Sequence, residues 1–189
     1  TVQTLAAYLD DEITAMPNLV TVGAGGTAST VAGIPFFSAD NSIYTHDVSG
    51  TDDTAQHNAA YGIGAMDAIT TGDQNSALGY NALSANNTGA QNTAMGRLSL
   101  EANTSGDNNT AYGSSTLSAN STADDNTAIG KGSMQSNTTG AANTAVGKDS
   151  LKANTTGTRN LAIGYQAYTA SDTENDNLAI GYQAMVTNT

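Results

Sequence analysis

The segment NTAIGKGSMQSNTTGAA at residues 126–142 is followed directly by NTAVGKDSLKANTTGTR at residues 143–159. The two segments share an opening Asn-Thr-Ala, a Gly at the fifth position and a later Asn-Thr-Thr-Gly group. The same 17-residue unit can be followed in both directions, from about residue 58 to the end of the chain, and no insertion breaks its spacing. An uninterrupted period of this kind indicates a repeat protein whose units stack on one another.

Several positions of the unit keep one kind of residue along the whole array, and we call the residues at one position of successive units a column. The first column is Asn throughout, at Asn58, Asn75, Asn92, Asn109, Asn126, Asn143, Asn160 and Asn177. The fifth column is Gly throughout, at Gly62, Gly79, Gly96, Gly113, Gly130, Gly147, Gly164 and Gly181. The third column is Ala, the fourth is a larger residue such as Ile129, and the ninth is a large, mostly aliphatic residue such as Leu117.

A helix fits this unit poorly, because Gly and Asn-Thr-rich stretches are unfavourable in helices. Two short extended segments fit better, one over the second to fourth positions and one around the ninth, with turns at Gly and at Asn-Thr-Thr-Gly. We expect positive φ at the fifth-column Gly and amide-to-amide bonds along the first-column Asn. Seven full coils and a partial eighth, paired through their backbones, would form a rod roughly 38 Å long.

The apolar third and fourth positions predict a contact with another chain. Neighbouring residues of a strand point to opposite faces, so these two side chains cannot both point into one coil. A roll with so thin an interior would be marginal by itself. We therefore expect identical rolls to pack around a shared axis and bury the outer apolar face.

Residues 1–57 lack the repeat and predict a separate N-terminal part. Apolar residues from Leu5 to Met16 follow the spacing of a short amphipathic helix, which Pro17 ends. In the small β lead-in that follows, a strand expected at residues 18–26 runs into Gly-rich chain and is followed by a second small apolar cluster from Ile34 to Tyr44. A polar connector over residues 49–57 then precedes the solenoid at residues 58–189. Because the chain starts at Thr1 and stops within a repeat, we expect it to be a piece of a longer polypeptide.

The composition argues against several classes of partner. The net charge is −12 and the five basic residues all lie within the repeats, so we expect binding neither to nucleic acid nor to an anionic membrane surface. The chain has no Cys, which removes disulfides and thiolate metal ligands. It has no apolar run of about 18 residues, so we expect no membrane insertion. Only 12% of residues are charged, as suits a structural or extracellular β protein, and we expect no cofactor.

The segments Asn126–Gly130, Asn143–Gly147 and Leu161–Ala167 resemble the head repeats of trimeric autotransporter adhesins, and more closely the longer-period repeats of phage tail fibres. The resemblance covers residues 58–189 and implies an all-β fold, a left-handed parallel β-roll with three chains around one axis. It implies a structural and adhesive role on a virion or cell surface, with other fibre or tail proteins and a host-surface glycan or protein as partners. A bacterial surface adhesin is the alternative. Because adhesin heads have a shorter period, no binding residue carries over.

Two groups of polar residues are weak candidates for metal ligands. Asp172, Glu174 and Asp176 alternate in the turn that replaces Asn-Thr-Thr-Gly, and calcium prefers such oxygen ligands. The histidines, His46 and His57, each have Asp residues nearby, but convergence of ligands is needed for a metal or acid–base site. We expect solvated turns instead, because the EF-hand and calcium β-roll patterns are both absent.

Three further functions have weaker support in the sequence. Asn-x-Thr/Ser triplets could accept glycans, although turn formation is the simpler explanation; they begin at Asn86, Asn103, Asn120, Asn137 and Asn154. The second column is Thr from Thr93 to Thr144 and could suit an ice-binding face, but a paired Thr-x-Thr strand is missing. A tail-spike glycan depolymerase would need carboxylates on one face, and because no catalytic arrangement is recognisable we predict no enzyme activity.

Overall fold

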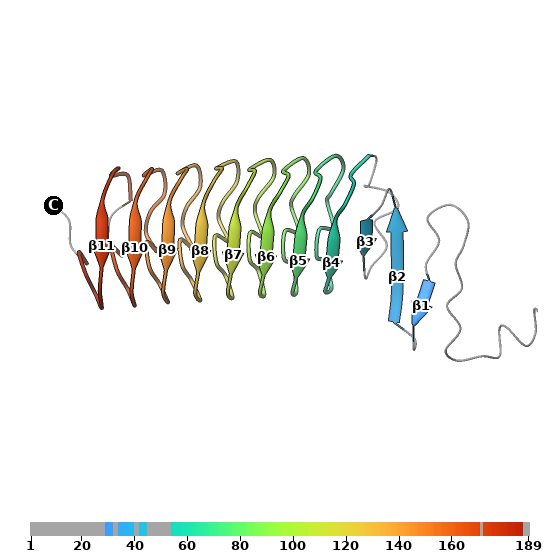
Figure 1. The fold of residues 1–189 in the computed structure, drawn as a ribbon, viewed down its shortest axis with the longest axis horizontal. Helices are drawn as coiled ribbons and strands as arrows, with labels where there is room; N and C mark the ends of the chain where they lie inside the picture. The colour runs from blue at the N-terminus through green and yellow to red at the C-terminus, as the bar shows by residue number, and fades with distance from the viewer. Residues whose placement is uncertain (1–28, 32–33, 40–41, 45–53, 171, 187–189) are drawn as a thin grey trace, which may run out of the picture.

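The computed structural model describes residues 29–31, 34–39, 42–44, 54–170 and 172–186. Its regular secondary structure is β throughout this part of the chain, and 11 strands form one sheet in sequence order. Figure 1 shows the strands side by side along a rod, with the chain coiling back between each of the later strands and the next. The helix expected between Leu5 and Met16 and the strand expected at residues 18–26 lie outside the described residues.

Three strands lead into the repeats. β1 (Ser29–Val31) pairs antiparallel with β2 (Ile34–Ala39), and β2 pairs antiparallel with β3 (Ser42–Tyr44). β3 then runs parallel to the first repeat strand, with Ile43 opposite Ala59. This pairing joins the lead-in strands to the same sheet as the repeats.

The repeats form a parallel β-solenoid, as the period predicts. Each unit contributes one strand of three residues, and each strand pairs with the strand one unit away, so that Thr110 lies opposite Thr127 and Ala111 opposite Ala128. The strands are β4 (Ala59–Tyr61), β5 (Ser76–Leu78), β6 (Thr93–Met95), β7 (Thr110–Tyr112), β8 (Thr127–Ile129), β9 (Thr144–Val146), β10 (Leu161–Ile163) and β11 (Leu178–Ile180). The in-register pairing turns each sequence column into a physical column.

The interior of each coil contains the third, eighth and ninth columns and two columns of buried Asn. The Ala of the third column points inward from the middle of every repeat strand, while the residues before and after it remain exposed or half-buried. The ninth column packs against it: Leu83, Leu100, Leu117 and Leu151 are completely buried. The expectation that the third and fourth columns point to opposite faces is therefore confirmed.

The prediction of a second extended segment around the ninth position is wrong. In the described repeats this stretch is a series of turns, and Leu117 has a φ of 50°. The cause is that two successive side chains, Thr116 and Leu117, are both buried, whereas a strand would send one of them outward. The backbone still bonds between coils, with Leu117 N–H donating to the Ser133 carbonyl at 3.1 Å.

The corner after each strand requires glycine, as expected. Gly113 has a φ of 138°, and a Cβ added to it would lie 2.7 Å from the backbone carbon of Gly130 in the next coil. The other corner glycines of the column share this conformation. The column is glycine because the backbones of successive coils meet there without room for a side chain.

The first-column Asn side chains mainly bond to backbone groups. Asn75 Oδ1 accepts the Asn92 backbone N–H at 2.9 Å, while Asn92 Nδ2 donates to the Gly106 carbonyl at 2.8 Å. Direct amide-to-amide bonds in this column occur at Asn109–Asn92 and Asn177–Asn160. The column thus closes the turn before each strand and fixes the register of the next coil.

A second Asn column forms the continuous amide ladder. Asn103, Asn120, Asn137 and Asn154 each donate from Nδ2 to Oδ1 of the Asn one coil earlier, at 2.8–3.0 Å. Each also donates to a backbone carbonyl three residues later. We expected such a ladder in the first column. The ladder forms instead in this second column, at the twelfth position of the unit, because these side chains point along the rod toward one another.

Candidate functional site

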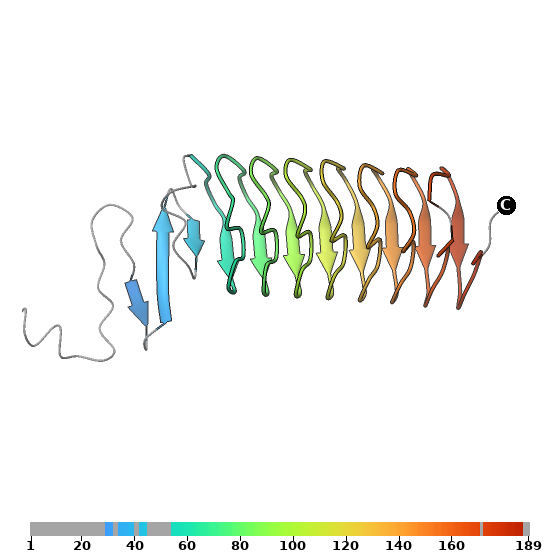
Figure 2. The ribbon, with the colours of Figure 1, turned by 180° about the vertical axis from the view of Figure 1, so that it is seen from behind.

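The outer face of the repeat sheet is a regular surface that runs along the rod. We call the second and fourth columns of β4–β11 the outer sheet face, and Figure 2 shows these strands side by side from behind. Tyr112 is 56% exposed and Ile129 is 40% exposed, although both are large and apolar or aromatic. Their neighbours Thr110 and Thr127 are half-buried and belong to a short Thr column. Nothing in the described part of the chain covers this face.

The outer sheet face has the character of an interaction surface. Exposed apolar or aromatic groups recur on it from Tyr61 to Ile180, with the half-buried Met95 and Val146 among them. Monomeric proteins rarely expose contiguous apolar surfaces larger than a few hundred Å². A flat sheet with one apolar column is suited to packing against another sheet or a similar flat surface.

The sixth position carries a second unusual surface, which the sequence analysis missed. We call it the basic–aromatic column; its members are Ile63, Tyr80, Arg97, Ser114, Lys131, Lys148, Tyr165 and Tyr182, of which Ser114 is half-buried and the others are exposed. Neighbouring members touch: the Arg97 guanidinium lies 5.9 Å from the centroid of the Tyr80 ring, and Tyr165 and Tyr182 stack at 5.4 Å. Comparing the units at their sixth position would have revealed it, because three of the five basic residues share that position.

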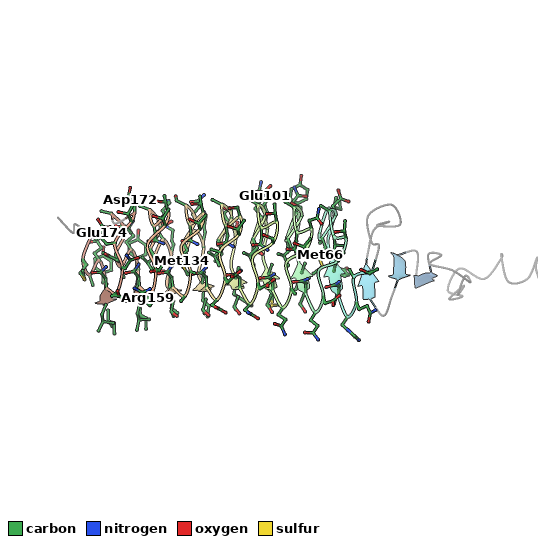
Figure 3. The ribbon with its side chains drawn as sticks, turned by 90° about the horizontal axis from the view of Figure 1, so that it is seen from above. Met66, Glu101, Met134, Arg159, Asp172 and Glu174 are labelled. Carbon is green, nitrogen blue, oxygen red and sulfur yellow. The ribbon has the colours of Figure 1, made fainter. Side chains whose placement is uncertain are left out.

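The candidate metal ligands in the 170–176 turn are exposed and do not converge. Asp172 and Glu174 lie on the last coils (Figure 3). The Asp176 carboxylate instead accepts two hydrogen bonds from Arg159, at 2.6 and 2.8 Å. This bonding lowers the pKa of Asp176. Throughout the part of the chain that the structure describes, no three His, Cys, Asp or Glu side chains are grouped as a metal site would require.

Of the histidines, His57 is described and lies exposed before the first repeat strand, whereas His46 lies outside the described residues. Among the described carboxylates, Asp149 has two lysine neighbours and lies 3.4 Å from Lys148 Nζ and 3.2 Å from Lys152 Nζ. Partial burial acts to raise the pKa of Asp149, but hydrogen bonds and charge from the two lysines outweigh it and lower the pKa. The group is an ion-pair cluster on the surface.

The Asn-x-Thr/Ser triplets serve the turn. Asn86, Asn103, Asn120, Asn137 and Asn154 are completely buried, and their Nδ2 atoms donate to backbone carbonyls. An N-linked glycan would have to replace a buried donor in the folded coil. The geometry therefore favours the turn-forming role over the glycan-acceptor role.

Comparison with protein-family models, with curated proteins and with solved structures finds no match to this chain. The described residues contain no helix that is long and apolar enough to cross a membrane. The outer sheet face and the basic–aromatic column are therefore the features from which a function has to be argued.

Proposed function

We propose that this chain is a structural and adhesive segment of a homotrimeric extracellular fibre, namely a bacteriophage tail fibre that contributes to attachment to the host surface. The observation that carries the proposal is the outer sheet face, whose exposed side chains, such as Tyr112 and Ile129, repeat along the rod. Burying this face against two further copies removes the apolar surface from water. The resemblance of the repeat to tail-fibre repeats supports three copies and a left-handed roll.

The described architecture suits a stiff spacer. Every coil is tied to the next by backbone bonds, by buried Asn side chains and by hydroxyl bonds such as Thr138 Oγ1 to the Thr155 carbonyl at 3.0 Å. Bending the rod would break several of these bonds at once. Three-fold symmetry would present three copies of any binding surface, and such multivalency strengthens individually weak contacts.

Sedimentation equilibrium of the purified chain tests the assembly. We expect the mass of three chains at micromolar concentration, and a folded monomer would contradict the proposal. The double variant Tyr112→Ser with Ile129→Ser should dissociate the trimer while keeping its coil, because both side chains point out of the coil. The matched control Thr122→Ala with Thr139→Ala changes two exposed residues in the turns that follow Asn120 and Asn137 and should remain trimeric.

Attachment is tested by incubating the fluorescently labelled chain with candidate bacterial hosts and measuring retained fluorescence. Retention on a restricted set of strains is expected, and equal retention on every strain would contradict a role in host recognition. The genes beside the coding sequence separate the two settings of the repeat. Phage structural genes support the tail fibre, and a downstream membrane-anchor barrel would assign the chain to a bacterial adhesin.

A further inference from the structure

We propose that the basic–aromatic column binds a linear polysaccharide that carries carboxylate groups. This inference rests on the proposed function, because it names the class of host-surface ligand that the fibre would recognise. It is carried by one relationship: the basic side chains Arg97, Lys131 and Lys148 and the rings Tyr165 and Tyr182 share one exposed column of an otherwise acidic rod.

The backbone holds this column in a fixed register. The Arg97 carbonyl accepts the Ser115 N–H at 2.8 Å, and the Lys131 carbonyl accepts the Asp149 N–H at 3.0 Å. The same bond recurs between the Tyr165 carbonyl and the Gln183 N–H at 2.9 Å. Successive members are thus one coil apart, and the column is a straight ridge with preset spacing. A preset binding surface loses little conformational entropy when a ligand binds.

The spacing of the charges favours a polymer with sparse charge. Arg97 and Lys131 are separated by two coils, or about 10 Å at the usual distance between strands. This is comparable with the length of a disaccharide in an extended polysaccharide. A polymer with an acid on every second sugar could therefore place one carboxylate near each of these side chains. Duplex DNA is a poorer match, because it carries one negative charge per about 1.7 Å of its length. A chain with a net charge of −12 would repel so dense a negative charge.

Two of the three cations have no carboxylate partner in the described part of the chain. Lys131 is exposed, and Arg97 lies over the Tyr80 ring. Lys148 is partly neutralised by Asp149 and lies 5.2 Å from the Tyr165 ring centroid. Arg97 and Lys131 are therefore the side chains most available to a carboxylate, and charge-assisted hydrogen bonds to guanidinium or ammonium groups are the stronger ones.

The aromatic end of the column supplies the apolar part of sugar recognition. Tyr182 is 73% exposed, and its ring stacks on Tyr165 with an interplanar angle of 10°. Beside the rings, Gln183 Nε2 donates to Gln166 Oε1 at 2.9 Å, so an amide pair borders the same surface. Sugar C–H groups can pack on the exposed tyrosine surfaces, and the amides can exchange hydrogen bonds with sugar hydroxyls.

Isothermal titration calorimetry of the full chain tests the inference, with polygalacturonate and hyaluronate oligosaccharides as probes and dextran as the neutral comparison. The test variant is Arg97→Gln with Lys131→Gln. The matched control is Lys152→Gln with Arg159→Gln, which also removes one Lys and one Arg but lies outside the column. Circular dichroism should show that both variants keep their fold, because all four side chains are exposed.

We expect at least one acidic oligosaccharide to bind, dextran to bind at least about tenfold more weakly, and the column variant to lose at least about tenfold in affinity, which is the scale of one charged hydrogen bond. The control should stay within about twofold, because Lys152 and Arg159 are not members of the column and pair instead with Asp149 and Asp176, and exposed ion pairs contribute little. Absence of binding to both acidic probes overturns the inference. Equal losses in the two variants, or equally tight binding of a single-stranded DNA oligonucleotide, also overturn it.

Sedimentation of the same samples separates this inference from the proposed function. A trimer that binds neither acidic probe overturns the polysaccharide ligand and leaves the fibre proposal intact. A monomer that binds through Arg97 and Lys131 overturns the trimeric fibre and supports the binding column.

Discussion

The side-chain amide of Asn120 donates a 2.9 Å hydrogen bond to Oδ1 of Asn103, one coil earlier in the rod. The same nitrogen donates to the Ala123 carbonyl at 3.0 Å, and Asn120 Oδ1 accepts the amide of Asn137 at 3.0 Å. Asn120 is completely buried, so water cannot replace these partners. One side chain therefore closes the turn of its own coil and ties it to the coils on both sides.

Replacing Asn120 by Ala should destabilise the rod strongly. The change leaves the buried Asn103 Oδ1 without its donor, whereas the Ala123 carbonyl keeps Asn109 Nδ2 and Asn137 Nδ2 keeps the Gly140 carbonyl. An unsatisfied buried group costs about 1–3 kcal/mol, and each further lost hydrogen bond costs about 1 kcal/mol. We expect a total loss of about 3 kcal/mol in the free energy of unfolding, measured by urea denaturation with circular dichroism. Asn87→Thr is the control, because Asn87 is exposed and Thr is common at its position. A control that loses as much as Asn120→Ala would argue against the buried ladder.

Replacing the corner glycine Gly113 by Ala should be far more damaging than the same change at Gly132, which lies two positions after a corner glycine. Gly113→Ala places a Cβ against the backbone of the next coil at a φ of 138°, so we expect a loss of about 3 kcal/mol or failure to fold. Gly132→Ala is the comparison, since its φ of 68° is one that L residues can adopt, and its Cβ would meet the movable carboxylate of Asp149. The comparison should cost about 1 kcal/mol. Melting temperatures by circular dichroism rank the two variants.

Shortening a ninth-column side chain should leave a cavity in a well-packed core and lower the free energy of unfolding. Leu117 is completely buried and has coils on both sides, so Leu117→Ala should lose about 3 kcal/mol of unfolding free energy. Leu117→Met should lose less than about 1.5 kcal/mol, because Met66 and Met134 occupy the same column and are equally buried. Urea denaturation measures both, and similar losses for Met and Ala would contradict the packing described.

Acid should remove the contribution that the Asp149 ion pairs make to the stability of the folded chain. The pKa of Asp149 is lowered in the folded chain by Lys152 and Lys148, so as pH falls the unfolded state takes up its proton first. The stabilisation is therefore complete above the ordinary carboxyl range and is lost below pH of about 4. Melting temperatures of the wild type and of Asp149→Asn should differ at neutral pH and converge in acid. A constant difference across this range would contradict the ion-pair assignment.

The columns could be predicted because they depend on covalent spacing alone. A period of 17 residues with no insertion brings equivalent residues together in any stack of coils, whichever way each side chain points. The corner Gly and the opposite directions of the third and fourth side chains followed from the same spacing, because a tight corner favours glycine and a strand alternates its faces. The structure showed that Ala128 is the residue that points inward and Ile129 the one that points outward.

The spacing of the repeat did not predict the backbone conformation of the segments that connect the repeat strands. The ninth position was expected in a strand, yet Leu117 has positive φ, because Thr116 and Leu117 both fill the interior. Likewise, both Asn columns recur every 17 residues, and the sequence cannot tell which one points along the rod. The basic–aromatic column is present in the sequence at the sixth position, and the structure added that its members are exposed and that Arg97 lies against Tyr80.

The sequence by itself determined the coil, its length, its glycine corner and the two faces of its strand, because these follow from a repeated local pattern. The tertiary structure alone decided that Asn120 bonds to Asn103 and that Arg97 lies over Tyr80. Those contacts depend on the direction of each side chain within a coil. The direction of each side chain is set by how the whole turn packs around its small interior. The sequence repeat alone does not determine that direction.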